Sequence, residues 1–177
     1  MRILAADTAL GACSVAVLDG DRVLAHCWVE MERGHAEALA PMVDDAIRAS
    51  GIAFDLLDRL SVTTGPGTFT GQRVGLAFMR GLRVALRKPL VGVTTLAAMQ
   101  EAAKAETGLT RAVALHDARR GEVYLEVAGV PVVLSFADAI AVLMPLQNGL
   151  ALAGTAAEQA KAELPGATLS TIRQPDA

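Results

Sequence analysis

The stretch that decides how this chain folds is Thr63-Thr64-Gly65-Pro66-Gly67-Thr68-Phe69-Thr70-Gly71-Gln72-Arg73-Val74-Gly75. Residues 60–64 are predicted to form a strand, and residues 71–86 carry the apolar periodicity of an amphipathic helix. Between them, Pro66 presets one turn dihedral, and Thr68 or Thr70 can cap the helix. The stretch therefore predicts a strand, a tight loop and a helix.

The loop also resembles a phosphate cradle, because free N–H groups and the dipole at a helix N-terminus attract anions. A P-loop requires Gly, four residues and then Gly-Lys-Ser/Thr, whereas a dinucleotide fingerprint requires Gly-x-Gly-x-x-Gly. Gly65, Gly67 and Gly71 fit neither spacing. The sequence therefore argues against a conventional phosphate loop at this position.

The helix that follows Gly71 has an unusually broad apolar surface. On a helical wheel, the side expected to pack on a sheet comprises Val74, Ala77, Phe78, Gly81, Val84 and Ala85. A second apolar stripe comprises Gly75, Met79, Leu82 and Leu86. The remaining positions carry Arg73, Arg80, Arg83 and Arg87. Two interpretations stay open: a core helix in a three-layer domain, or a helix that docks on a partner where Gly75 permits close approach.

Composition narrows the class of protein. The chain has 177 residues and 53% hydrophobic content, enough for one ordinary domain or two small ones with a well-supplied core. A net charge of -3 argues against a generally basic nucleic-acid binder, and 3% aromatic residues argue against base-stacking platforms. No apolar run is long enough to span a membrane, and residues 3–6 read as a strand rather than a signal peptide, so a cytoplasmic protein is expected.

The N-terminal third is predicted to be an antiparallel meander of strands over residues 2–6, 12–18 and 22–29. Asp7 follows the first strand, where it could hold a metal-bound phosphate or simply form a turn. The hairpin signal Asp19-Gly20 would pair Cys13 with His26 and direct Cys13 and Cys27 to opposite faces of the sheet. Both cysteines are therefore expected to stay reduced.

The rest of the chain alternates helices and strands. A helix is predicted from about residue 36 to 49, with a strand at 89–93 and a further helix at about 95–105. His35 lies at the start of the first of these helices without a second ligand at i+4, so we interpret it as a capping or contact residue and not as a metal ligand. Three antiparallel strands followed by alternating helices and strands have the order of a ribonuclease-H-like half-domain.

A second, smaller unit is predicted after residue 108, giving domains over residues 1–108 and 109–177. Residues 112–116 and 122–127 are predicted to form a hairpin around Asp117–Gly121. Further elements are expected as strands at 131–134, 150–153 and 168–172, and as helices at 135–143, capped by Ser135, and 156–164. The fold class expected is α/β and actin-like, a duplicated ribonuclease-H-like (ASKHA) superfold with mixed sheets.

Several blocks of the sequence match one family. They are Ile3–Thr8 with Ala12–Val17, Arg33–Glu37, Gly65–Gly75, Pro89–Leu96 and Asp117–Tyr124. On these blocks, most of residues 1–125 resembles the TsaB family, formerly called YeaZ. The resemblance implies a cytoplasmic, non-catalytic subunit in bacterial synthesis of N6-threonylcarbamoyladenosine at position 37 of tRNAs that read ANN codons. It further implies pairing with the catalytic paralogue TsaD, the ATPase TsaE as a third component, homodimers in isolation, and tRNA bound through the complex.

The resemblance also implies which residues act. Pairing would use the helix at 33–49 and the helix after Gly71. The expected interface residues are His35, Leu39, Met42, Thr68, Phe69, Thr70, Gly71, Arg73, Gly75, Met79, Leu82 and Leu86. Asp7 and Thr8 would form a vestigial phosphate turn, with no cofactor of the chain's own but ATP or ADP at a subunit boundary. Residues 95–106 lack the paired histidines of the catalytic paralogue, so neither a metal site nor catalytic residues are expected.

Two other functions compete with this one. An independent actin-fold ATPase or phosphotransferase could use Asp7, although the second hairpin offers only Asp117 followed by arginines. A direct tRNA-binding module could use the arginines of the long helix, although an acidic protein partner fits the negative net charge better. The chain also departs from the family at Ala9-Leu10, where Ser-Thr is common, and members usually continue beyond the equivalent of Ala177. The packing of the second domain is therefore left open.

Overall fold

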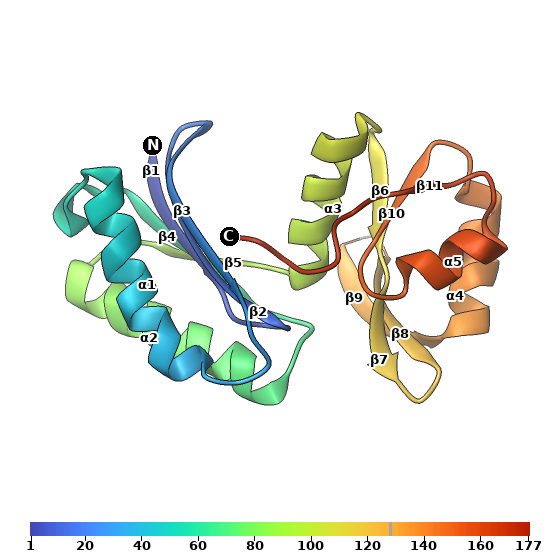
Figure 1. Ribbon diagram of the computed structural model, residues 1–177, viewed down its shortest axis with the longest axis horizontal. Coiled ribbons are helices and arrows are strands. Elements are labelled where there is room, and N and C mark those ends of the chain that lie inside the picture. Colours follow the sequence, from blue (N-terminus) through green and yellow to red (C-terminus); the bar gives the residue numbers. More distant parts are fainter. Residues whose placement is uncertain (128) are drawn as a thin grey trace. The chain divides into compact units, whose positions relative to one another are not determined.

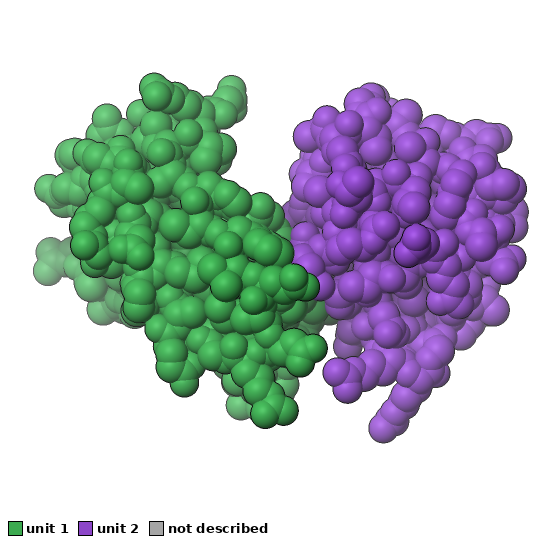
Figure 2. Space-filling model, viewed as in Figure 1, with its two compact units in different colours: residues 1–95, 175–177 green, residues 96–174 purple. Residues whose placement is uncertain are grey.

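The computed structural model describes residues 1–127 and 129–177. Two compact units divide the chain: unit 1 holds residues 1–95 and 175–177, and unit 2 holds residues 96–174 (Figure 2). The sequence placed the boundary after residue 108 and so kept the helix at 95–107 with the first unit. The structure groups nearly all of this helix with unit 2, because its buried side chains pack on the strands of that unit.

Unit 1 is built on a five-stranded sheet in the order β3-β2-β1-β4-β5. The strands are β1 (Arg2–Asp7), β2 (Ala12–Asp19), β3 (Arg22–Glu30), β4 (Arg59–Thr63) and β5 (Leu90–Val93). The first three are antiparallel, and β4 and β5 run parallel to β1. Both the meander and the parallel second half were predicted, because hairpin signals and crossover helices each fix strand direction.

Helices α1 (His35–Ser50) and α2 (Phe69–Leu86) cover one face of this sheet (Figure 1), and a single 3-10 turn, η1 (Phe54–Leu56), precedes β4. The core between helices and sheet contains the fully buried Leu4, Val15, Leu60, Leu39 and Met79. Gly51 ends α1 in the left-handed conformation, which glycine adopts without steric cost.

The β2–β3 register differs from the expected one and changes the positions of the cysteines. The turn is one residue later than predicted, so that Asp19 pairs with Arg22, and a bulge follows Val17. A bulge adds one residue to one strand and therefore reverses which residues share a face. Cys27 is opposite Val15, so Cys27 and Cys13 point to the same face, and the predicted opposite orientation is wrong. That the thiols stay reduced remains a prediction.

Unit 2 contains two three-stranded sheets. One has the order β11-β10-β6 with parallel pairs, and the other has the antiparallel order β7-β8-β9. The strands are β6 (Arg111–Ala114), β7 (His116–Arg119), β8 (Glu122–Val127), β9 (Val130–Ser135), β10 (Leu150–Ala153) and β11 (Thr168–Leu169). The helices are α3 (Thr95–Thr107), α4 (Phe136–Leu143), the 3-10 turn η2 (Met144–Leu146) and α5 (Ala157–Glu163).

The predicted strand at 112–116 is two strands in the structure, so the expected hairpin partner was wrong. The chain changes sheets at Leu115, whose N–H donates to the Ala153 carbonyl at 2.8 Å. The apolar β6 pairs with β10, while the more polar β7 forms the hairpin with β8. The predicted cap of α4 is confirmed, because Ser135 Oγ accepts the Asp138 N–H at 3.1 Å.

Buried side chains on the two faces of the β6–β10 sheet belong to different clusters. Leu96, Met99 and Ala103 of α3 pack on Ala114 and Ala151, and α4 and α5 contribute to the core with Val113 and Leu152. In the part of the chain that is described, no helix combines the length and the hydropathy that a membrane span requires.

Candidate functional site

The loop between β4 and α2 is bonded tightly to the turn after β1. Thr68 caps α2, since its Oγ1 accepts the Gly71 N–H at 3.1 Å, and its own N–H donates to the Ala9 carbonyl at 2.7 Å. Thr8 Oγ1 donates to the Gly71 carbonyl at 2.7 Å. A Cβ at residue 75 would lie only 2.6 Å from Thr8 Oγ1. Glycine at residue 75 therefore allows α2 to lie close to the turn that follows β1.

Asp7 lies beside Thr63, where the parallel strands β1 and β4 end. Its side chain is fully buried, and Oδ1 accepts hydrogen bonds from the Thr63 hydroxyl and from the Ala9 N–H at 3.3 Å. Oδ2 has no partner among the described residues. Burial, with a smaller contribution from the negative charge of Asp176, raises the pKa of this carboxyl to about 6 against the lowering effect of the two hydrogen bonds.

These contacts use the polar atoms that a phosphate turn would present. The Asp7 carboxyl is buried, the Thr8 hydroxyl donates within the chain, and the N–H groups of Ala9 and Thr68 have acceptors. Within residues 1–127 and 129–177, no three His, Cys, Asp or Glu side chains gather as a metal ligand set. Whether Asp7 and Thr8 bind a phosphate group stays a prediction.

The most distinctive surface of unit 1 is an apolar groove between α1 and α2. The depression has a volume of about 490 Å³ and is lined by Ala36, Leu39, Val74, Ala77, Phe78, Gly81, Leu82 and Ala85. Three of the lining positions on α2, residues 77, 81 and 85, are small and recur every fourth residue, so they share one exposed face. We call this depression the α1–α2 groove. Small side chains in a row allow another backbone to approach closely.

A second, more polar depression of about 500 Å³ adjoins the groove where α1 and α2 begin, and it shares Ala36 and Val74 with the groove. Its other lining residues are Glu32, Arg33, Gly34, His35, Glu37, Thr68, Thr70 and Gly71. Acidic and basic side chains both contribute, so charged groups border the apolar groove at this end. Such a combination of an apolar centre and a polar border is typical of protein interfaces.

The structure reverses the two faces of α2 that the sequence assigned. Gly75 and Met79, expected at a partner surface, are buried against unit 1's own sheet, and Met79 is 0% exposed. Leu82 and Leu86 are half-buried and pack on the same core. The face expected on the sheet instead contains exposed Ala77, Gly81, Val84 and Ala85. The assignment failed because both faces are apolar; the small residues of one face were the signal for its exposure.

The other predicted interface residues divide into two groups. His35, Leu39, Thr68, Thr70, Gly71 and Leu82 line the two depressions. Met42 packs on the core of unit 1, and Phe69 is 70% exposed with the Arg73 guanidinium 3.5 Å from its ring centre. His35 is a contact residue, one of the two roles expected for it: its Nε2 lies 3.2 Å from the carbonyl of Leu10, in the turn after β1. Ala77, Phe78, Gly81 and Ala85 belong to the groove but were not predicted there.

Comparisons with known proteins identify relatives of this chain. The family model for TsaD, tRNA N6-adenosine threonylcarbamoyltransferase, matches residues 29–140. The Escherichia coli tRNA threonylcarbamoyladenosine biosynthesis protein TsaB is 43% identical over 124 residues, which cover 70% of this chain and 53% of that protein. The Haemophilus influenzae TsaB is 37% identical over 125 residues, which cover 70% of this chain and 52% of that protein. The chain therefore spans about half the length of the curated relatives it matches.

Solved structures extend the similarity to the whole chain. YeaZ from Pseudomonas aeruginosa superposes with a TM-score of 0.83 at 32% identity, covering 99% of this chain and 86% of that one. An activator of 2-hydroxyisocaproyl-CoA dehydratase from Clostridium difficile superposes with a TM-score of 0.53 over 98% of this chain and 90% of that one. Its identity of 8% shows the fold alone. The predicted actin-like α/β fold class is confirmed.

Proposed function

Because the chain belongs to the TsaB (YeaZ) family, we propose that it is a non-catalytic subunit of the complex that forms N6-threonylcarbamoyladenosine at position 37 of tRNAs reading ANN codons. The names of its relatives place them in this biosynthesis, and the TsaD model that matches residues 29–140 describes a transferase. The work of this subunit is to support the catalytic TsaD paralogue in the cytoplasm.

The observation that carries the proposal is the α1–α2 groove. Ala77, Gly81 and Ala85 form its small-residue row, and apolar side chains of both helices make up the rest of its lining. A pair of helices from the TsaD paralogue would bury these side chains and approach closely over residue 81, which removes apolar surface from water. In isolation, a second copy of the chain would occupy the same groove, giving a homodimer.

The remaining components follow from the same assignment. TsaE joins the pair as the ATPase, and tRNA binds to the complex and not to the isolated chain. The chain contributes no cofactor of its own, and ATP or ADP is held at a boundary between subunits. The polar depression beside the groove, with Arg33, His35 and Thr70 in its lining, suits such a boundary because it combines charged and hydroxyl side chains.

An independent ATPase or phosphotransferase that uses Asp7 is the alternative. Metal-assisted phosphoryl transfer needs ionised carboxylates that can reach a metal ion. Asp7 is fully buried, and its Oδ1 already accepts hydrogen bonds from Thr63 and Ala9, so little of the carboxylate is exposed to a metal ion. The hydroxyl of Thr8 is also engaged, with the Gly71 carbonyl. These contacts favour the subunit function over the alternative.

Reconstitution with purified components tests the proposal. The chain alone is expected to transfer no threonylcarbamoyl group to an unmodified tRNA and to hydrolyse ATP only at background. Addition of TsaD, TsaE and threonylcarbamoyl-adenylate should give modified tRNA, and omission of this chain should abolish it. Turnover by the pure chain that disappears in Asp7→Ala would instead establish the alternative function.

A further inference from the structure

A row of arginines occupies the C-terminal half of α2. Arg80, Arg83 and Arg87 are exposed and recur at intervals of three and four residues, so they share one side of the helix. At the usual helical rise, they follow each other at about 4.5 Å and about 6 Å along the axis. Residues 69–88 contain no Asp or Glu, so no acidic side chain of α2 itself neutralises the row.

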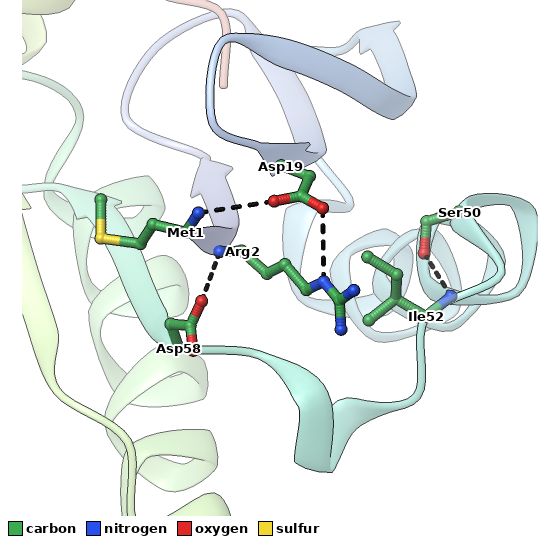
Figure 3. A network of polar contacts seen from close by, with 6 residues as sticks. All are labelled: Met1, Arg2, Asp19, Ser50, Ile52 and Asp58. Carbon is green, nitrogen blue, oxygen red and sulfur yellow. Dashed lines mark hydrogen bonds and ion pairs between the residues drawn. The ribbon is translucent and has the colours of Figure 1, made fainter.

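Two other surface arginines of unit 1, Arg2 and Arg48, have carboxylate partners, whereas these three have none among the described residues. The guanidinium of Arg2 contacts the Asp19 carboxylate at 3.4 Å (Figure 3), and Arg48 lies 2.5 Å from Asp44. Among the described residues, no ion pair involves the arginines of the row. The C-terminal dipole of α2 favours cations there, but it is far smaller than three full charges.

The end of the row is a concave surface lined by cations. A depression of about 650 Å³ is lined by Arg83, Val84, Arg87, Lys88 and Pro89, with no carboxylate in the lining. The Lys88 ammonium is oriented by a hydrogen bond of 2.8 Å to the Asp55 carbonyl. Arg87 has a φ of 54° at the end of the helix, a conformation in which glycine is usual. A cation is therefore present where the backbone alone would favour glycine.

The row lies on a different side of α2 from the groove. At 100° per residue, Arg80, Arg83 and Arg87 are between about 100° and 160° from Gly81 around the helix axis. A protein seated in the α1–α2 groove would thus leave the arginines accessible. Any macromolecule that contacts them can bind at the same time as the proposed partner.

We propose that this row and depression contact the phosphate backbone of an RNA strand. The inference rests on the proposed function, in which the complex acts on tRNA. Repeated guanidinium groups match the repeated charges of a phosphate backbone, and they position RNA without reading its sequence. The overall negative charge of the chain weakens binding by the isolated chain, so the contact adds to affinity that the complex supplies.

The test measures the salt dependence of tRNA binding. An unmodified tRNA transcript is titrated with the complex of this chain and TsaD, and fluorescence anisotropy is followed between 50 and 200 mM salt. The variant replaces Arg80, Arg83 and Arg87 by glutamine. Loss of three phosphate contacts should reduce the slope of log affinity against log salt by roughly 2 to 3. A control variant replaces Arg22, Arg119 and Arg120 by glutamine, which is the same change in charge at the β2–β3 and β7–β8 hairpin ends, and it should keep the wild-type slope.

Arg87→Gly shows whether an effect comes from unfolding. Glycine adopts the left-handed backbone of residue 87 easily, so the melting temperature of this variant should not fall. Because one cation is lost, its slope of log affinity against log salt should decrease by roughly 1. Unchanged slopes in both row variants, or an equal loss in the control variant, would overturn the proposal. So would loss of TsaD pairing in the row variant, since the surface would then be a protein contact. Gel filtration of the wild-type chain with TsaD shows whether the two proteins pair, and this tests the proposed function separately.

Discussion

Replacement of Asp7 by asparagine is expected to stabilise the folded chain at neutral pH. The carboxyl is fully buried, and its pKa is raised from 3.8 to about 6, chiefly by loss of water around the charge. The folded chain therefore holds a proton between about pH 4 and 6 that the unfolded chain has released. Stability is then present below pH 3.8 and is lost as the pH rises through about 6.

The difference between these pKa values corresponds to roughly 3 kcal/mol of unfolding free energy above pH 6. Asparagine keeps the oxygen that accepts from Thr63 and Ala9 but has no charge to bury. Asp7→Asn should therefore be more stable than wild type at pH 7.5 by up to about 3 kcal/mol, with the gain absent near pH 3.5.

Urea unfolding of the whole chain, followed by tryptophan fluorescence, reports on unit 1, because Trp28 is the only tryptophan and lies in β3. Its fluorescence is followed for wild type and Asp7→Asn at both pH values. Asp21→Asn, at the exposed β2–β3 turn, serves as the matched control and should change stability little at either pH. An Asp7→Asn variant that is less stable than wild type at pH 7.5, or equally shifted at both pH values, would refute the reasoning.

Three further predictions concern stability and reactivity. Met79→Ala should cost about 2–5 kcal/mol in the same fluorescence assay, because it removes a fully buried core side chain; a change within error would mean that the site is exposed. Glu106 accepts hydrogen bonds from Ser170 and Thr171, which lower its pKa, so its contribution to stability is present above pH 4.5 and fades on acidification. The melting temperature of Glu106→Gln should thus be lower than that of wild type at pH 7, and the two should be equal at pH 3. The same difference in melting temperature at both pH values would contradict this. Burial raises the pKa of Cys13 to about 11, so Ellman's reagent at pH 8 should react first with the half-buried Cys27. The fast phase of this reaction should therefore be absent in the variant Cys27→Ser, and a fast phase that persists would contradict the prediction.

Local signals in the sequence were sufficient for most elements of the fold. The strand, loop and helix around residues 59–86 follow from apolar periodicity and from a threonine cap, and Ser135 was identified as a cap in the same way. Strand direction also followed, because tight turns require antiparallel neighbours and crossover helices give parallel ones. These features depend on residues that are close in the chain.

Features that depend on distant contacts were not predictable in the same way. The bulge after Val17 has no distinct sequence signal, yet it reversed the face of Cys27. The run at 112–116 is continuous in the sequence, but the chain changes sheets at Leu115. The orientation of α2 depended on Gly75, whose contact with Thr8 links segments more than sixty residues apart.

The most direct test of the proposed function is pairing by the variant Gly81→Glu. Apart from the neighbouring residues and backbone of α2 itself, no atom lies within 4 Å of a Cβ built at residue 81, so the side chain fits the unpaired chain. Removal of a helical glycine should not lower its stability. Burial of the carboxylate beneath a partner would cost several kcal/mol. Ala105→Glu, at an exposed position of α3, is the control.

Gel filtration of each variant with TsaD, alongside its melting temperature and tRNA modification in the reconstituted reaction, gives the answer. We predict that Gly81→Glu melts no lower than wild type, no longer pairs with TsaD and supports no modification, while Ala105→Glu behaves as wild type in all three assays. A Gly81→Glu chain that pairs with TsaD as well as wild type does would contradict the proposal that the α1–α2 groove is the pairing surface.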